Sequence, residues 1–341
     1  MADRKVSMQD IADELGVSKV TVSKALNGKE GVGEELREKI FQVAEREGYI
    51  LPDYGQRKAR KVGIIMSERF SSQSDTGKFY MGMYESIIGQ LRKASCSSMM
   101  ITPNAESLAR DLETIEKSEM FDGLILLGIL DRVVRKKLES IDLPKIYVDV
   151  YDEKHRSDSV VTENIYSTYE MTNYLLKNGH REIGFVGTIG ATTSITDRYL
   201  GYSRSLIEQG LYPNTEWTIP DRSEDGSAIE LELPSKMPTA FLCNCDETAF
   251  RLVKVLKEQG LQVPRDISVV GFDNDIYAEL CDPGLTTVAV DTEEIGRVAA
   301  RRILRHMERG GHKEGIVYRI AGKNIIRNSV RNLNKTADKQ D

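Results

Sequence analysis

The sequence contains no apolar run long enough to span a bilayer, and its first ten residues, MADRKVSMQD, lack the apolar core of a signal peptide. Of its 341 residues, 40% are hydrophobic and 29% are charged, which is typical of a soluble globular protein. These absences argue against a membrane protein and against a secreted one. We therefore expect the chain to remain in the cytoplasm.

The sequence also has few of the residue patterns that metal sites and nucleotide-dependent enzymes use. Its four cysteines lack the paired spacing of zinc ligands, and its four histidines are scattered. Cys243 and Cys245 end an apolar run, which favours buried free thiols over metal or redox chemistry. Neither GxGxxG nor a GxxxxGKS/T phosphate loop occurs. We expect no metal, no cofactor and no catalytic site.

A strongly basic composition, which many nucleic-acid-binding proteins have, is missing as well. The formal net charge is −6. Up to Lys61 the chain has 12 Lys and Arg against 11 Asp and Glu, and the remainder has 35 against 42. The basic groups of the first part are concentrated at Lys19, Lys24 and the run 57–61. Their distribution matters more than the sum, because only the surface that faces DNA must attract phosphates.

The stretch from Val6 to Asn27 has the pattern of two short helices joined by a tight turn. Ser7 and Asp10 form a capping signature at the start of the first helix. Gly16 suits the backbone of the turn, and Ser18 suits the cap of the second helix. This pattern predicts a helix-turn-helix, with an ordinary helical hairpin as the alternative.

The second of these helices has one apolar face, formed by Val22, Ala25 and Leu26, which we expect to point inward. A recognition helix meets base edges and phosphates with the first turns of its other face. Lys19 and Lys24 suit guanine acceptors, and Val20 suits a thymine methyl group. Thr21 and Ser23 suit phosphate.

A loop and a third amphipathic helix follow, with the landmarks ALNG at 25–28, GVGEELREKI at 31–40, Ala44 and Gly48-Tyr49. With them the chain resembles the lactose-repressor (LacI) family of bacterial transcription regulators, over roughly Lys5 to Arg327. The resemblance implies a helix-turn-helix DNA-binding domain at residues 1–48 and a homodimer on a roughly palindromic operator. The DNA-binding residues that we expect are Ser7, Ser18, Lys19, Val20, Thr21, Ser23, Lys24, Asn27, Arg57 and Lys58.

Residues 49–61, YILPDYGQRKARK, read as a hinge or linker because they combine Pro, Gly and a basic run without apolar periodicity. In the family this segment becomes a helix on specific DNA and inserts a leucine into the minor groove. Here no leucine occurs between Pro52 and Val62, so the leucine contact is in doubt. Arg57, Lys58 and Arg60 still suit phosphate or a narrow minor groove, and a solvated linker is the alternative.

From Val62 onward, short apolar runs alternate with helical patterns. Strands are expected at 61–66, 97–102, 123–128, 145–150, 159–163, 182–187, 239–244, 268–273 and 286–290, and helices near 80–94, 108–118, 132–140, 166–178, 197–209, 246–259 and 291–309. Two such series predict an α/β fold with two doubly wound lobes. The resemblance implies a periplasmic-binding-protein-like core with three crossovers. We assign about 62–158 and 291–315 to lobe 1, 159–288 and 316–331 to lobe 2, and 332–341 to a disordered tail.

Ligands of open parallel sheets bind beyond the carboxyl ends of the strands, so we expect an effector site between the lobes. In lobe 1, Arg69 and Phe70 follow the first strand, and Asp149 follows the fourth and can accept hydroxyl hydrogens. Phe79 and Tyr80 open the next helix and suit a stacked sugar or base; packing of that helix is the alternative.

In lobe 2, the segment TSITDR at 193–198 resembles the family segment whose arginine reaches the effector. We assign that role to Arg198, with a surface ion pair to Asp197 as the alternative. Cys245 stands where the family commonly has an asparagine, which leaves open whether Asn244 replaces it. The other lobe 2 residues in the predicted site are Asp246, first as a helix cap and second as a ligand contact, and Phe272 and Asp273.

Three classes of function remain. The first is a DNA-binding repressor whose operator affinity a small molecule modulates, and a sugar or oligosaccharide suits the predicted cleft best. The second is a sugar-binding or transport protein, which needs a secretion signal and no helix-turn-helix. The third is a nucleotide-dependent enzyme, for which the phosphate loop is missing. No leucine heptads follow Arg331, so we expect a dimer and not a tetramer.

Overall fold

The computed structural model describes residues 6–26, 31–47, 49, 60–67, 75–103, 107, 110–111, 113, 115, 120–223, 226–309 and 314–337. The chain divides into two compact units, residues 1–58 and residues 59–341. Each is described by itself. The division falls inside the predicted linker, of which only Tyr49, Arg60 and Lys61 lie among the described residues.

The first unit is a three-helix domain whose helices are α1 (Met8–Leu15), α2 (Lys19–Leu26) and α3 (Glu34–Arg46). The predicted capping box is confirmed, since the Ser7 side chain accepts from the Asp10 amide and the Asp10 carboxylate accepts from the Ser7 amide. Gly16 ends α1 with φ +63°, the left-handed conformation that glycine tolerates best. Ile11, Val22 and Ile40, one from each helix, are fully buried together in the small core.

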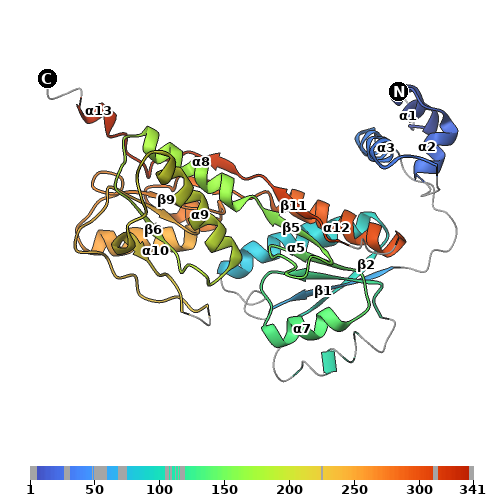
Figure 1. The fold of residues 1–341 in the computed structure, drawn as a ribbon, viewed down its shortest axis with the longest axis horizontal. Coiled ribbons are helices and arrows are strands. Elements are labelled where there is room, and N and C mark those ends of the chain that lie inside the picture. Colours follow the sequence, from blue (N-terminus) through green and yellow to red (C-terminus); the bar gives the residue numbers. More distant parts are fainter. Residues whose placement is uncertain are drawn as a thin grey trace. The chain divides into compact units, whose positions relative to one another are not determined.

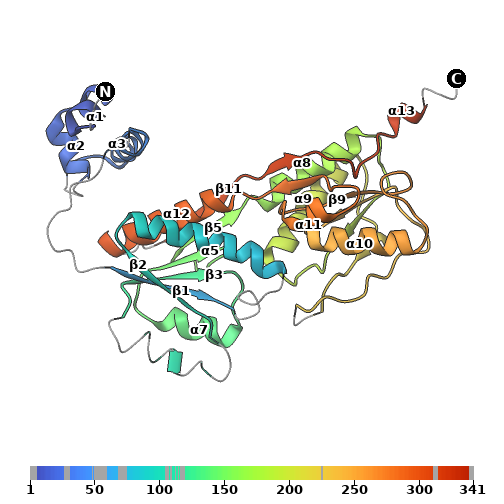
Figure 2. The ribbon, with the colours of Figure 1, turned by 180° about the vertical axis from the view of Figure 1, so that it is seen from behind.

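The second unit begins with a six-stranded parallel sheet in the order β11-β5-β4-β3-β1-β2. Its strands are β1 (Lys61–Met66), β2 (Ser97–Ile101), β3 (Gly123–Leu127), β4 (Lys145–Val148), β5 (Asp158–Thr162) and β11 (Val317–Ile320). Helices α5 (Asp75–Lys93) and α12 (Thr292–Arg309) lie side by side on one face, and α7 (Arg132–Ser140) covers the other (Figures 1 and 2). The inner strands β1 and β3 are apolar and buried on both faces because helices cover both faces.

The second lobe contains a four-stranded parallel sheet in the order β7-β6-β8-β9. Its strands are β6 (Ile183–Val186), β7 (Thr218–Ile219), β8 (Ala240–Cys243) and β9 (Ser268–Val270). A two-stranded antiparallel pair, β10 (Thr287–Ala289) and β12 (Lys323–Ile325), joins it through bridges from Val270 to Thr286 and from Asp273 to Ala289. Helices α8 (Asn164–Lys177) and α9 (Thr193–Glu208) pack on one face, and α10 (Asp246–Glu258) and α11 (Ile276–Leu280) pack on the other.

The predicted fold class, a helix-turn-helix domain followed by two parallel α/β lobes, is therefore confirmed. Three connections cross between the lobes, after β5, after β10 and after β11. The crossovers are packed tightly: a Cβ atom on Gly322 would lie 2.5 Å from the Val288 side chain and 3.1 Å from Ser167 Oγ. Of the predicted helix at 108–118, most residues lie outside the described part of the chain.

Two predictions about the domain boundaries were wrong. Strands β5 and β11 were assigned to lobe 2, but they pair with each other and with β4 at the edge of the lobe 1 sheet. Alternation of strands and helices shows that a strand exists but not which sheet it joins. The predicted disordered tail is ordered at its start, where α13 (Asn334–Ala337) follows a bond from the Leu333 amide to the Asn178 carbonyl, 2.8 Å.

Candidate functional site

Helix α2 presents the side chains that a recognition helix needs. Val22, Ala25 and Leu26 are buried, as predicted, whereas Lys19 and Lys24 are exposed and Val20 keeps 64% of its surface. An exposed Val20 is free to make the thymine methyl contact that the sequence analysis expects. The orientation predicted for α2 is confirmed.

Two serines of the predicted DNA-binding set hold helix ends. Ser18 Oγ accepts from the Thr21 amide at 3.0 Å, and the Ser18 and Thr21 hydroxyls lie 2.8 Å apart. Ser7 Oγ donates to Asp10 Oδ2 at 2.6 Å. Both serines are exposed, so these caps leave them at the surface. Asn27, Arg57 and Lys58 lie outside the described residues, and Arg60 donates to Glu308 on α12 at 2.8 Å.

A cleft of about 300 Å³ lies between the two lobes of the second unit. Six of the ten predicted effector residues line it. They are Phe79, Tyr80, Asp149, Arg198, Asn244 and Asp273. Arg69 and Phe70 lie outside the described residues. A cavity of this size is within the range of small-molecule sites, and it is formed where the carboxyl ends of the strands meet.

In the lobe 2 wall of the cleft, one ring contact and three hydrogen bonds fix the Arg198 side chain. It lies on α9 with its guanidinium stacked on the Phe272 ring, 3.7 Å from the ring centre. Its Nε donates to Asn164 Oδ1 at 2.9 Å, its Nη2 donates to Asp273 Oδ1 at 3.1 Å, and its Nη1 donates to the Asn244 carbonyl. The predicted alternative, a surface ion pair with Asp197, is not what the structure shows, because Arg198 is buried and pairs with Asp273.

Asp149 is the main polar group of the lobe 1 wall. Its backbone has φ +60°, a conformation that a non-glycine residue rarely adopts, and its carboxylate accepts from the Tyr80 hydroxyl at 2.7 Å. Burial raises the pKa of Asp149 to about 6, and the hydrogen bond from Tyr80 and the charge of Arg198 only partly oppose this effect. Asp149 therefore titrates near pH 6.

Two carboxyl groups from the loop after β9 line the cleft from the side of lobe 2. Asp273 has φ +102°, and burial raises its pKa, although Arg198 opposes the shift. Asp275, which the sequence analysis did not select, also lines the cleft. Burial, with the nearby charge of Asp273, raises the pKa of Asp275 to about 7. Strained backbone and shifted pKa values in one cleft are typical of a binding site.

A second group of cleft residues was also missed, and it is centred on Asp221. Asp221 accepts from Arg222 at 2.7 Å, from Asn244 Nδ2 at 2.8 Å, from Thr248 Oγ1 at 2.8 Å and from the Thr188 amide at 2.9 Å. Burial alone would raise the pKa of Asp221, but these bonds hold it below its usual range. No sequence signal identified this group, because Asp221 follows a strand of only two residues.

Two predicted effector residues, Asp246 and Phe272, do not line the cleft. Asp246 is fully buried and does not cap α10, whose N-cap Cys245 makes no side-chain cap bond. Instead its carboxyl group accepts from Thr287 Oγ1 at 2.7 Å and from the Asp275 amide at 3.1 Å, so it joins three segments. Phe272 is 1% exposed, and its ring stacks against the Arg198 guanidinium.

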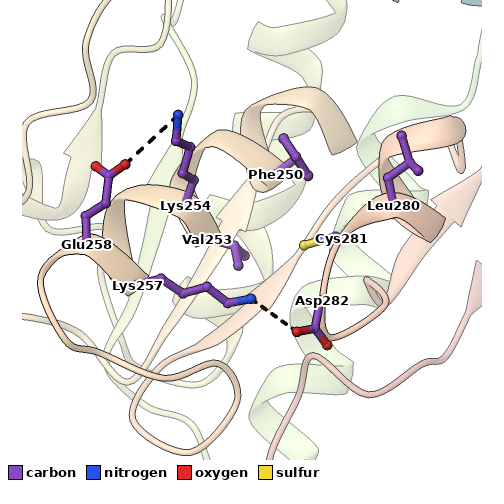
Figure 3. Close-up of a pocket in the computed structure, with 8 residues that line it drawn as sticks. All are labelled: Phe250, Val253, Lys254, Lys257, Glu258, Leu280, Cys281 and Asp282. Carbon is purple, nitrogen blue, oxygen red and sulfur yellow. Dashed lines mark hydrogen bonds and ion pairs between the residues drawn. The ribbon is translucent and has the colours of Figure 1, made fainter.

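A second cavity, of about 400 Å³, lies outside the cleft, between α10 and α11 (Figure 3). Its apolar side chains include Phe250, Val253 and Leu280, and the ion pair between Lys257 and Asp282, 3.3 Å, lies at its edge. Leu280 keeps 62% of its surface. No residue of the predicted site lies here.

The four cysteines are free thiols that differ in burial. Cys96, Cys243 and Cys281 are buried free thiols, and Cys245 is a half-buried free thiol in the cleft whose pKa burial raises to about 12. Among the described residues, no group of three or more His, Cys, Asp or Glu side chains is placed to hold a metal ion. None of the helices described is long and apolar enough to cross a membrane.

Comparison with known proteins agrees with both units. The model of bacterial regulatory proteins, lacI family, matches residues 7–51, and that of the periplasmic binding protein-like domain matches residues 172–330. The HTH-type transcriptional regulator RegA of Clostridium saccharobutylicum is 28% identical over 316 residues, which cover 88% of this chain and 92% of RegA. The HTH-type transcriptional repressor PurR of Vibrio campbellii is 25% identical over 339 residues, which cover 96% of this chain and 99% of PurR.

Among solved structures, the complex of the transcriptional regulator CelR with cellobiose has a TM-score of 0.68 at 20% identity and covers 95% of this chain and 100% of CelR. This likeness concerns the fold. The sequence relatives, in contrast, match along nearly their whole length, from the helix-turn-helix through both lobes. By its helix-turn-helix domain, its two-lobed core and these matches, the chain is similar over nearly its whole length to transcriptional regulators, and its N-terminal domain matches the lacI family of bacterial regulatory proteins.

Proposed function

We propose that this chain is a sequence-specific DNA-binding repressor whose operator affinity changes when a sugar or oligosaccharide binds between the lobes of its core. The observation that carries the proposal is the presence of two surfaces in one chain. Helix α2 exposes Lys19, Val20 and Lys24, and a separate cleft of the second unit gathers Asp149, Arg198 and other polar groups. The relatives named as transcriptional regulators support the first part.

A carbohydrate suits the cleft because its lining combines aromatic rings with carboxyl groups. Phe79 and Tyr80 pack edge to face, with ring centres 5.5 Å apart, and a sugar ring can rest on such a surface. Asp149 and Asp273 can accept hydrogens from ring hydroxyls. The cellobiose complex of the structural neighbour CelR points to the same class of ligand.

A homodimer follows from the proposed DNA target, since a two-fold symmetric protein reads two half-sites of a palindrome. Leu280 on α11 lines the cavity of Figure 3 and exposes 62% of its surface, and Ile276 on the same helix exposes 45%. We place the contact with a second copy on this apolar surface. We also place the protein in the cytoplasm, where its DNA target is.

The effector can act on DNA only through a difference in its affinity for two arrangements of the lobes. Arg60 lies near the end of the predicted hinge, and its bond to Glu308 ties that end to the last turn of α12. At its other end, α12 begins directly after the crossover that follows β10. Helix α12 therefore connects the crossovers to the hinge, and a movement of the crossovers can displace the hinge through this helix.

The test has two parts. Selection of bound sequences from random duplex DNA should enrich a palindromic site, and thermal melting with sugars, nucleobases and sugar phosphates should reveal a ligand that raises the melting temperature by mass action. Enrichment without any melting shift would retain the regulator and reject the small-molecule effector. A melting shift without DNA enrichment would support the alternative, a solute-binding protein without a DNA function.

A further inference from the structure

The loop that follows β9 has a rare backbone conformation where it enters the cleft. Asp273 and Asn274, two consecutive residues, have φ +102° and +55°. Residues other than glycine seldom adopt these left-handed conformations, because the Cβ atom comes too close to the backbone carbonyl oxygen. Asp273 lines the cleft from this turn, and its carboxylate accepts from Arg198. The direction of the Asp273 side chain therefore depends on a backbone that its surroundings must support.

Arg327 provides a contact of this kind from a segment 53 positions later in the chain. Its Nη2 donates to Asn274 Oδ1 at 2.9 Å, and its Nη1 donates to the Leu285 carbonyl at 2.9 Å. The Arg327 amide donates to Thr286 Oγ1 at 3.0 Å. The side chain is also packed closely, since a Cβ atom on Gly284 would lie 3.3 Å from Arg327 Cδ. The guanidinium that reaches Asn274 is therefore fixed in position.

The same loop contacts two of the segments that connect the lobes. The Asp273 amide donates to the Val288 carbonyl at 2.8 Å, and the Val290 amide donates to the Asp273 carbonyl at 3.3 Å. Val290 lies in the crossover from β10 to α12. Arg327 follows β12, which the chain enters after the crossover from β11. Asp273 thus lies where the cleft meets both of these crossovers.

A structural role for Arg327 is the alternative, because its bonds to Leu285 and Thr286 would suffice to hold the segment after β12 on lobe 2. The third bond, however, ends on the side chain of Asn274, directly after the cleft residue Asp273. Asparagine is also one of the few non-glycine residues that adopt the left-handed conformation readily. The residue type at position 274 and its hydrogen bond therefore support the same backbone conformation.

We propose that Arg327 is a positioning residue of the effector cleft, and that its bond to Asn274 holds the left-handed turn that directs Asp273 toward Arg198 and the ligand. This proposal rests on the proposed effector function, and it adds a residue that is not itself part of the cleft lining. Loss of the donor leaves the turn without this support, so that Asp273 takes other directions in part of the molecules.

The first experiment is amide exchange of the full chain, followed by mass spectrometry on peptides that contain Asp275. The Asp275 amide donates to Asp246 Oδ2 at 3.1 Å, so its exchange reports how often the loop opens. Arg327→Met removes the donors, and we expect exchange at Asp275 to become about tenfold faster. Asn274→Ala removes the acceptor but leaves the bond from Arg327 to Leu285 in place, and it should have the same effect.

Two further variants separate positioning from a structural role. Glu279 lies 3.9 Å from Arg327 Nη2 and its side chain is 72% exposed, so Glu279→Gln is the matched control and should leave the exchange unchanged. Glycine adopts the left-handed conformation without support. Asn274→Gly added to Arg327→Met should therefore return the exchange at Asp275 to within about threefold of the parent protein.

The second experiment is calorimetric titration of the same variants with cellobiose, the ligand in the complex of the structural neighbour CelR. We expect cellobiose to bind about tenfold more weakly to Arg327→Met and to Asn274→Ala than to the parent protein. The double variant with Asn274→Gly should recover most of this affinity, and Glu279→Gln should bind like the parent.

Fast exchange that the added glycine does not reverse would overturn the proposal, because Arg327 would then act through Leu285 and Thr286 alone. Equal cellobiose affinity in the parent and in Arg327→Met would overturn it as well. If Arg327→Met does not fold, Asn274→Ala must still exchange faster than Asn274→Gly, and equal rates would reject the positioning role. Failure of the parent protein to bind cellobiose would count against the carbohydrate effector, whereas the exchange rates and their rescue would still decide whether Arg327 holds the loop.

Discussion

The Tyr151 hydroxyl donates to Asp197 Oδ2 at 2.8 Å, and this hydrogen bond joins the two lobes. Tyr151 follows β4 of lobe 1, and Asp197 lies on α9 of lobe 2, directly before the cleft residue Arg198. Arg319 and Glu163, which belong to the crossover region, contribute to the electrostatics of Asp197. The bond thus links the lobe arrangement to the position of the predicted effector arginine.

We predict that Tyr151→Phe loosens the two lobes, because it deletes the donor and little else. A hydrogen bond to a carboxyl group contributes about 1–3 kcal/mol, so opening should become roughly five- to 150-fold more frequent. Amide exchange of Glu163, whose N–H donates to the Ile320 carbonyl across the crossovers at 2.8 Å, measures this. Asp197→Asn keeps an acceptor and should exchange like the parent. Equal acceleration in both variants would assign the effect to charge instead.

Lys24→Ala should relax sequence preference at one base pair of the operator, at a cost of about 1–3 kcal/mol. Lys24 is exposed on α2, and a lysine there can donate to guanine acceptors. Competition binding with single-base operator variants measures the effect. If all sequences lost affinity alike, Lys24 would be a phosphate contact and the assignment of a base contact would be wrong.

Acid should destabilise the core through Asp158, which is fully buried between β5 and α12. It accepts from Arg302 at 2.7 Å, from His306 at 2.9 Å and from the Ile316 amide at 2.9 Å. Burial alone would raise the pKa of Asp158, but these bonds lower it to about 2 from an ordinary value of 3.8. A depressed pKa contributes stability above pH 4 that is lost as the pH falls toward 2.

The contribution of Asp158 should be about 2 kcal/mol. Urea unfolding of the core at a series of pH values measures it. Asp158→Asn should be less stable at pH 7 and should lose this part of the pH dependence. A parent and a variant whose stabilities fall in parallel between pH 4 and pH 2 would show that other carboxylates dominate.

Effector binding should tighten as the pH rises from 5 to 7. Asp149 has a pKa of about 6 in the free cleft, and a hydroxyl that donates to its carboxylate favours the ionised form. Binding should therefore release up to one proton from Asp149 below pH 6. Titration with the sugar found by the melting screen, in buffers of different ionisation enthalpy, counts the protons. Asp149→Asn should flatten this pH profile, and an unchanged profile would exclude Asp149.

Leu280→Glu should convert the dimer to a monomer, since it places a charge in the apolar surface beside the cavity of Figure 3. Sedimentation equilibrium of the full chain measures the mass. Ile207 on α9 is 52% exposed at a different surface, so Ile207→Glu is the matched control and should leave the dimer intact. A dimer that persists in Leu280→Glu would place the interface elsewhere.

Local patterns accounted for most of the fold that could be predicted. The capping box at Ser7, the turn at Gly16 and the buried face of α2 follow from contacts three or four residues apart, which periodicity reveals. The alternation of strands and helices likewise predicted most core elements to within a few residues, but it missed β7 and α11. Asp149 and Asp273 were selected because each stands near the carboxyl end of a strand, and Arg198 was selected because its segment resembles that of the family. All three line the cleft.

The features that the sequence did not predict depend on contacts between residues that lie far apart in the chain. Strand order in the lobe 1 sheet is not sequential, so β5 and β11 were assigned to the wrong lobe. The cleft partners of Arg198 lie 34 to 75 positions away, and Asp221 enters the site from a two-residue strand. The periodicity of a sequence shows only which residues share a face of the same helix or strand. Which strand ends converge, and which carboxyl groups become desolvated there, depends on how the sheets assemble in three dimensions.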